Sequence, residues 1–180
     1  MLLKEILFFI LPLLLVGLIH HLIIIKYNLF SFLAIPIDRN IKLNNDYLFG
    51  PAKTWRGIVT VVILSGIFYY LVSYFWDMNL RFPVLLSGCL LGLGYAVGEL
   101  PNSFIKRRLG IQSSQSNYQG RNIIFYLFDQ IDSILGALLF ICLVYNASIL
   151  LLVYILIIGS LLHYLVDEIL HHYSYKKYNK

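Results

Sequence analysis

The sequence predicts an all-α, polytopic membrane protein, a helical bundle of about five transmembrane helices. Of its 180 residues, 59% are hydrophobic and only 13% are charged, and the mean hydropathy is +0.78. This composition excludes a disordered chain and is not typical of a soluble domain. No segment shows the alternation of a membrane β-barrel, so helices are the remaining way to pair backbone groups inside lipid.

Five apolar stretches approach the roughly 20 residues that a helix needs to cross the hydrocarbon layer. They run from Ile6 to Ile25, Gly57 to Trp76, Phe82 to Val97, Ile123 to Tyr145 and Ile149 to Val166. The third is short, and the fourth contains two aspartates. Because no linker or second domain interrupts them, we expect residues 1–180 to form a single integral-membrane domain.

The distribution of cationic residues predicts the orientation. With the N-terminus outside, twelve of the 14 Lys and Arg residues lie on the cytoplasmic side, and only Lys4 and Arg81 lie outside. We therefore expect a multi-pass protein of the cell membrane. The C-terminus and two polar loops, residues 26–56 and 98–122, would face the cytoplasm. A re-entrant third stretch would reverse the side of everything after it.

Asp129 and Asp132 are the first functional candidates because they lie inside the apolar fourth stretch. A carboxylate at membrane depth costs at least ~2.5 kcal/mol, so such residues usually line a polar cavity and carry function. Three residues apart, the two side chains share one helical face. Carboxylates grouped in this way are typical ligands of Mg²⁺, which also binds substrate phosphates.

The second polar loop carries a further acid and a basic cluster. Glu99, Ser103 and Lys106 share one face if the third helix continues past the membrane surface. Pro101 supports a second interpretation equally well: the helix ends just before the proline and a new helix begins there. The run Lys106-Arg107-Arg108 supplies charge for phosphate oxygens. Acids beside such a cluster indicate metal-assisted phosphate chemistry at the membrane surface.

In the first loop, Lys53, Thr54 and Arg56 place two cations and a hydroxyl at the start of the second stretch. An interfacial Trp55 with snorkelling cations explains this composition equally well. The segment is not a P-loop, because the spacing of that motif is missing. Composition alone therefore leaves the class of this segment open.

Other features of the chain are given structural interpretations. Two GxxxG spacings in the third stretch, Gly88 to Gly92 and Gly94 to Gly98, permit close backbone contact near the site. His163 and Asp167 are four residues apart, but we interpret them as interfacial polar residues. No histidine is assigned a catalytic role.

Four motifs follow one another in the chain: Pro36-Ile37-Asp38, then Phe49-Gly50 with Lys53-Thr54-Trp55-Arg56-Gly57, then Ser103-Phe104-Ile105-Lys106-Arg107-Arg108-Leu109-Gly110, and finally Asp129-Gln130-x-Asp132. In this order they resemble the CDP-archaeol synthase family, which is related to the phosphatidate cytidylyltransferases. The resemblance implies transfer of CMP from CTP to a membrane lipid phosphate, with Mg²⁺ as cofactor, by a five-span protein open to the cytoplasm. The family has Gly-Asp where this chain has Gly98-Glu99, and a loop bearing proline and glycine where this chain has residues 112–120.

The residues and the resemblance together predict a site. The predicted metal ligands are Glu99, Asp129 and Asp132, and the predicted catalytic residues are Lys106, Asp129 and Asp132. CTP or the lipid phosphate would be bound by Lys53, Thr54, Arg56, Ser103, Lys106 and Arg107. The lipid phosphate would resemble archaetidic acid or phosphatidate, no nucleic-acid partner is expected, and the oligomeric state is left open. The alternatives are a CTP-dependent lipid kinase and a non-enzymatic transporter or scaffold derived from the family.

Overall fold

The computed structural model describes the chain except for residues 1, 22–25, 44–45, 112–121 and 179–180. Its five α-helices are α1 (Leu2–Ile19), α2 (Trp55–Ser73), α3 (Val84–Arg108), α4 (Asn122–Val144) and α5 (Ile149–Tyr178). All five are long and apolar enough to cross a membrane. This confirms the predicted all-α membrane bundle. The loop at residues 112–120, whose departure from the family was noted above, lies outside the described residues.

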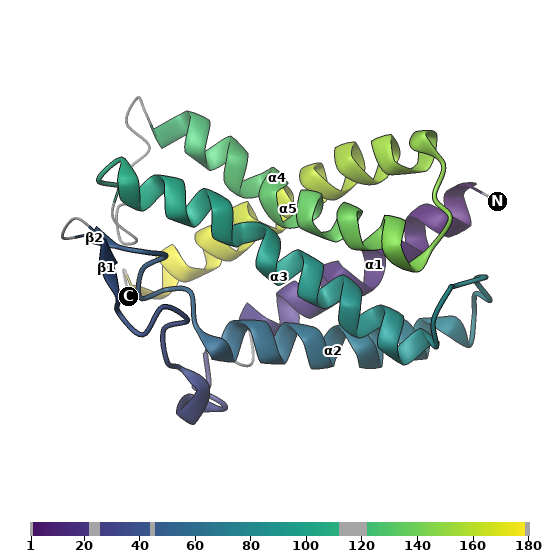
Figure 1. The fold of residues 1–180 in the computed structure, drawn as a ribbon, viewed down its shortest axis with the longest axis horizontal. Coiled ribbons are helices and arrows are strands. Elements are labelled where there is room, and N and C mark those ends of the chain that lie inside the picture. Colours follow the sequence, from purple (N-terminus) through teal and green to yellow (C-terminus); the bar gives the residue numbers. More distant parts are fainter. Residues whose placement is uncertain (1, 22–25, 44–45, 112–121, 179–180) are drawn as a thin grey trace.

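The helices run along the long axis of the molecule (Figure 1). The connections from α2 to α3 and from α4 to α5 lie at one end. The other end carries the segment between α1 and α2, which contains the 3-10 turn η2 (Ser31–Leu33) and the short antiparallel strands β1 (Lys42–Leu43) and β2 (Asp46–Tyr47). Loop residues with candidate function therefore gather at a single end of the bundle.

Helix α3 continues through Pro101 without a break and is 25 residues long. The interpretation as two helices divided before the proline is therefore wrong, and α3 is long and apolar enough to cross the membrane once. Pro101 is exposed, and it lacks the N–H that would donate to the carbonyl of Val97, yet the helix continues past it. One rigid element consequently carries Glu99, Asn102 and Lys106 on successive turns.

The two GxxxG spacings of α3 contact two different helices. A Cβ added to Gly88 would lie 2.9 Å from the backbone oxygen of Ser65, on α2. A Cβ added to Gly98 would lie 2.5 Å from the backbone oxygen of Asp132 and 2.8 Å from the Cα of Gly136, on α4. Only glycine permits helix backbones to approach this closely. Helix α3 is therefore the centre of the bundle, held against α2 on one side and α4 on the other.

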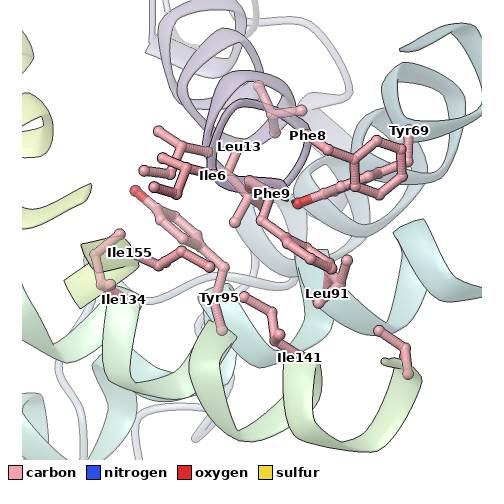
Figure 2. Close-up of a cluster of buried hydrophobic side chains, with 14 of the residues drawn as sticks. Ile6, Phe8, Phe9, Leu13, Tyr69, Leu91, Tyr95, Ile134, Ile141 and Ile155 are labelled. Carbon is pink, nitrogen blue, oxygen red and sulfur yellow. Dashed lines mark hydrogen bonds between the residues drawn. The ribbon is translucent and has the colours of Figure 1, made fainter. Parts of the chain in front are cut away.

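Large buried side chains fill the space between α1 and the other helices (Figure 2). Phe8 and Phe9 of α1 are fully buried, and Phe8 packs edge-to-face against Tyr69 of α2. The Tyr69 hydroxyl donates a 2.7 Å hydrogen bond to the carbonyl of Phe9. Because this phenol finds a partner inside the bundle, a bulky polar side chain is buried here without an unsatisfied group.

At the end opposite η2, the two cations predicted to lie outside bind backbone carbonyls. The guanidinium of Arg81 donates to the carbonyl of Cys142 at 3.0 Å, near the C-terminus of α4. The ammonium of Lys4 donates to the carbonyl of Asp77 at 2.8 Å. Cations near helix C-termini interact favourably with unpaired carbonyls. These two residues therefore tie the helix ends together.

Gly136→Ala is expected to destabilise the protein, because the new Cβ would lie 2.6 Å from the Cα of Gly98 and would also strike the carbonyl oxygen of Gly94. Overpacking of this kind costs about 1–3 kcal/mol. The measurement is the temperature at which the detergent-solubilised protein loses its monodisperse size-exclusion peak. Gly17→Ala is the control, since a Cβ there would meet only the Tyr95 hydroxyl, at 4.0 Å. Equal midpoints for the two variants would contradict the close α3–α4 contact.

Candidate active site

A buried aspartate organises the loop that precedes α2. Asp38 is only 5% exposed, and its carboxylate accepts hydrogen bonds from the backbone N–H groups of Asn40 and Phe49 at 2.9 Å and of Gly50 at 3.2 Å. Gly50 has a φ of 92°, which only glycine adopts without strain. Asp38 thus binds a residue 12 positions further along the chain and fixes the segment that leads to Lys53.

Lys53 is presented by a short backbone pairing at the same place. The N–H of Ile37 donates to the carbonyl of Lys53 at 2.9 Å, and the N–H of Trp55 donates to that of Ile35 at 3.0 Å. The next residue, Thr54, caps α2, because its hydroxyl accepts from the N–H of Gly57 at 3.4 Å. Lys53 therefore stands at the rim of the bundle, immediately before the first turn of α2.

The Lys53 ammonium forms an ion pair with the Glu99 carboxylate of α3. The other oxygen of Glu99 accepts a 2.9 Å hydrogen bond from the hydroxyl of Ser133, on α4. Burial lowers the pKa of Lys53, but the charge of Glu99, the hydrogen bond to Glu99 and the charges of Asp132 and Asp129 together outweigh burial and raise that pKa above the ordinary lysine value. Lys53 is therefore cationic at neutral pH, and Glu99 connects the first loop to both α3 and α4.

A second acid–base group lies where α3 faces α4. The amide nitrogen of Asn102 donates to Asp129 at 2.7 Å and to Asp132 at 2.8 Å. Lys106, one turn further along α3, forms an ion pair with Asp129. Since the Asp129 side chain is 42% exposed, this pair remains accessible to a ligand. Lys106 is thus in direct contact with Asp129, one of the two candidate aspartates.

Asp132 joins the two groups. One of its oxygens accepts from the backbone N–H of Ser133 at 2.6 Å and from the Ser133 hydroxyl at 3.3 Å. The same hydroxyl binds Glu99. A continuous polar chain therefore runs from Lys53 through the three acids to Lys106.

The other predicted binding residues have different partners. Arg56 donates to the side chain of Asn28 at 2.8 Å, and the Arg107 guanidinium donates to the carbonyl of Phe49 at 3.3 Å. Arg108 binds the carbonyls of Leu43, Asp46 and Tyr47 in the β1–β2 segment, at 2.5, 3.0 and 2.6 Å. The basic run therefore secures the first loop to the end of α3. Ser103 is buried, and no hydrogen bond within the described residues links it to the carboxylates.

The predicted metal ligands divide into a pair and a single residue. In the described part of the chain, no three His, Cys, Asp or Glu side chains surround one point. Asp129 and Asp132, however, each place an oxygen within 2.8 Å of the same nitrogen, that of Asn102. A pair of convergent carboxylates fits Mg²⁺, which takes one or two of them and completes its shell with water and phosphate oxygens. Glu99 is engaged by Lys53 and Ser133, and its role as a ligand stays a prediction.

A cavity of about 390 Å³ begins beside Lys53 and Glu99 and continues between the helices. Thr54 and Arg56 line it near Lys53, and residues from all five helices contribute to the rest. His163, which we interpreted as interfacial, also lines this cavity, as do His20 and His21. The Tyr95 hydroxyl lies 3.1 Å from Nε2 of His163, so this histidine belongs to the interior of the bundle.

Three residues of the site were not selected from the sequence. Asn102 and Ser133 are neutral, and their importance depends on which carboxylates face them across the α3–α4 contact. Asp38 belongs to one of the motifs above, but its buried position could not be inferred from an irregular loop. A usable signal existed for Ser133, which directly follows Asp132 and precedes Gly136 on the same helical face.

Comparison with known proteins places the chain in a family. The profile described as CarS-like CDP-archaeol synthase matches residues 1–178. The chain belongs to the CDP-archaeol synthase family. It is 32% identical over 149 residues to the CDP-archaeol synthase of Methanosphaerula palustris. The aligned region covers 74% of this chain and 82% of the relative.

Other members of the family show similar likeness. Identity to the CDP-archaeol synthase of Methanospirillum hungatei is 32% over 141 residues, 72% of this chain and 80% of the relative. Identity to that of Pyrococcus furiosus is 43% over 68 residues, 36% of this chain and 39% of the relative. No solved structure gives a significant match. The resemblance stated from the motifs is thus confirmed.

Asp38→Ala is expected to loosen the first loop, because three backbone N–H groups lose a charged acceptor at a cost of about 1–3 kcal/mol. The measurement is the rate of tryptic cleavage after Arg39 and Lys42 in detergent, which should rise at least several-fold. Asp46→Ala is the control, since it removes an exposed acid whose contact with Arg108 is made by the backbone. Equal cleavage rates in the two variants would show that Asp38 does not hold the loop.

Proposed function

We propose that this protein transfers CMP from CTP to a membrane lipid phosphate, forming a CDP-activated lipid and releasing pyrophosphate. The relatives named above are CDP-archaeol synthases, and the family profile matches residues 1–178. The observation that carries the proposal is the polar chain from Lys53 to Lys106, in which two cations flank three carboxylates at one end of a membrane bundle. This arrangement suits two anionic substrates that must meet at a membrane surface.

The reaction needs positioning and charge neutralisation more than proton transfer. An oxygen of the lipid phosphate attacks the α-phosphorus of CTP, and the bond from that phosphorus to the β-phosphate oxygen breaks. Because the attacking oxygen is already anionic, no side chain has to act as a general base. Lys106, bound in this structure to Asp129, would exchange part of that contact for a phosphate oxygen.

Mg²⁺ is proposed as the cofactor, with Asp129 and Asp132 as its protein ligands and Glu99 as a third candidate. Bound there, it would neutralise phosphate charge. Asn102 would orient the two aspartates, since its amide group already contacts both. Ser133 would orient Asp132 in the same way.

We also propose that this end of the bundle faces the cytoplasm and that the host membrane is the cell membrane. The support is the charge distribution, in which Arg81 and Lys4 are the cations at the opposite end. CTP is a cytoplasmic nucleotide, so a site reached from that side would have its substrate available.

The direct test is to incubate detergent-purified protein with CTP, Mg²⁺ and a panel of diacyl and ether-isoprenoid lipid phosphates. We expect a CDP-lipid, identified by mass, and one pyrophosphate per lipid converted. Release of CDP with a newly phosphorylated lipid would indicate a CTP-dependent kinase instead. No CTP consumption with any lipid would overturn the proposal.

Asp129→Asn is expected to lower kcat/KM by about 100-fold, equivalent to about 2.7 kcal/mol of transition-state stabilisation. The amide can no longer act as an anionic oxygen ligand, although it fills the same space. Asp46→Asn, in the exposed β1–β2 segment, is the matched control and should retain wild-type activity. Wild-type activity in Asp129→Asn, with an unchanged size-exclusion profile, would remove Asp129 from the site.

Lys106→Ala should lower kcat/KM for CTP about ten- to a hundredfold, because a charge-assisted bond to phosphate contributes roughly 1.5–3 kcal/mol. Lys42→Ala is the matched control: its ammonium lies 5.0 Å from the Tyr47 ring centre in an exposed loop. Steady-state kinetics with varied CTP measures both. Equal losses in the two variants would mean that general surface charge, and not a defined nucleotide site, governs the reaction.

A further inference from the structure

The segment between α1 and α2 exposes a group of apolar side chains around η2. Tyr27, Phe30 and Phe32 are 65%, 49% and 71% exposed, and Ile35 is 51% exposed. We call these four residues the η2 patch. The rings of Phe30 and Phe32 lie edge-to-face with their centres 6.5 Å apart, so they share one side of the turn. Large apolar side chains gathered outside the spans of a protein mark an interaction surface.

Phe30 presents its ring outward from a strained backbone. Its φ is 53°, in the left-handed region that a bulky residue rarely adopts and that costs conformational energy when a Cβ is present. The turn is closed by the N–H of Leu33, which donates to the carbonyl of Phe30 at 2.9 Å. About half of Phe30 is nevertheless left uncovered by the described chain. Apolar surroundings outside the chain would make this conformation favourable.

Two contacts fix the η2 patch at the level where α2 begins. The N–H of Trp55 donates to the carbonyl of Ile35 at 3.0 Å, and the guanidinium of Arg56 donates to the side chain of Asn28 at 2.8 Å. Trp55 is the first residue of a membrane span and is 44% exposed, and tryptophans are enriched at the boundary between headgroups and hydrocarbon. In Figure 1 the dark-blue η2 turn lies beside the start of α2, displaced across the long axis of the bundle. Lipid surrounds a membrane bundle at this position.

The strands of the same segment lie further from the spans. Arg108, which binds carbonyls of β2, follows Glu99 on α3 by nine residues, or about 13 Å. Glu99 itself pairs with Lys53, just before α2. The strands accordingly lie beyond the start of α2, at the far end of the molecule (Figure 1). Lys42 and Asp46 are exposed there, as expected for a surface in water.

We propose that the η2 patch inserts into the membrane, at the boundary between headgroups and hydrocarbon in the leaflet beside Lys53. Aromatic and aliphatic side chains of interfacial segments lie in this boundary. Lys26, whose ammonium lies 5.5 Å from the Tyr27 ring centre, would bind anionic headgroups there. The backbone pairing that joins Ile35 to Trp55 continues to the carbonyl of Lys53, so the inserted patch fixes the first loop relative to the lipid surface. Insertion is independent of the reaction proposed above.

A single tryptophan in the patch tests the insertion. Phe32→Trp, made in a Trp55→Phe, Trp76→Phe background, is reconstituted into vesicles of phosphatidylglycerol and phosphatidylcholine. We expect short-wavelength emission, and several-fold stronger quenching by lipids brominated near the headgroup end of the acyl chain than by lipids brominated near its methyl end. Asp46→Trp in the same background is the control. It should emit as in water and be quenched by acrylamide several-fold more strongly than Phe32→Trp.

Two outcomes of this measurement would overturn the proposal. One is water-like emission from Phe32→Trp with the acrylamide quenching of Asp46→Trp. The other is short-wavelength emission that neither brominated lipid quenches, which would indicate that protein, such as a second copy of this chain, covers the patch. Because Phe32 is 71% exposed, its replacement leaves the helix packing intact, and a normal size-exclusion peak checks this.

Removal of the two rings tests whether the patch holds the segment at the membrane. The double variant Phe30→Ser, Phe32→Ser should raise the rate of tryptic cleavage after Lys26 in vesicles several-fold, because the leaflet no longer shields this bond. Trypsin added outside cuts only molecules whose η2 end faces outward. The double variant Ile41→Ser, Leu43→Ser, which alters exposed apolar residues at β1, is the matched control and should leave the rate unchanged. Equal rates in the two double variants would overturn the anchoring.

Discussion

The close backbone contact between α3 and α4 is the constraint on which the site depends. Gly98 and Gly136 meet without side chains between them. Each lies close to a residue of the site: Glu99 directly follows Gly98, and Ser133 precedes Gly136 by less than one turn. Short side chains such as Asn, Ser and Asp can join two helices only where the backbones approach this closely. The same contact brings Asn102 to both aspartates of α4.

Much of this architecture was predictable, because a membrane imposes simple rules on a sequence. Span length, apolar composition and the intramembrane position of Asp129 and Asp132 follow from the cost of burying polar groups in lipid. The GxxxG spacings indicated close contact, but a spacing does not name its partner. That Gly88 faces α2 while Gly98 faces α4 depends on the rotation of α3 about its axis, which tertiary packing sets. The path of α3 through Pro101 was also undecided, because a proline inside a helical segment either ends the helix or is accommodated within it.

The charged residues of the site were predictable from the sequence, and the neutral residues that bind them were not. Glu99 and Lys106 were selected because acids beside a basic cluster indicate phosphate chemistry, and Lys53 was selected through the resemblance to the family. Ser133 and Asn102 cost little wherever they lie, so charge alone does not select them, and only the position of Ser133 beside Asp132 could have drawn attention to it. Arg107 and Arg108 illustrate the opposite difficulty: the run was interpreted through phosphate binding, whereas three carbonyls of the β1–β2 segment occupy Arg108. The positive charge of Arg108 was recognised, but the carbonyl of Tyr47 that it binds lies more than 60 residues away in the sequence.

The order of these partners along the chain has a consequence for biosynthesis. Chains emerge from the ribosome N-terminus first, so Lys53 precedes Glu99 by 46 residues, and Asn102 and Lys106 precede Asp129 and Asp132. When α4 enters the membrane with its two carboxylates, the amide and the ammonium that pair with them are already in place on α3. Docking of α4 against α3 therefore gives both carboxylates a partner. Nascent protein halted after α3 would hold its cations ready but have no aspartates for them to bind.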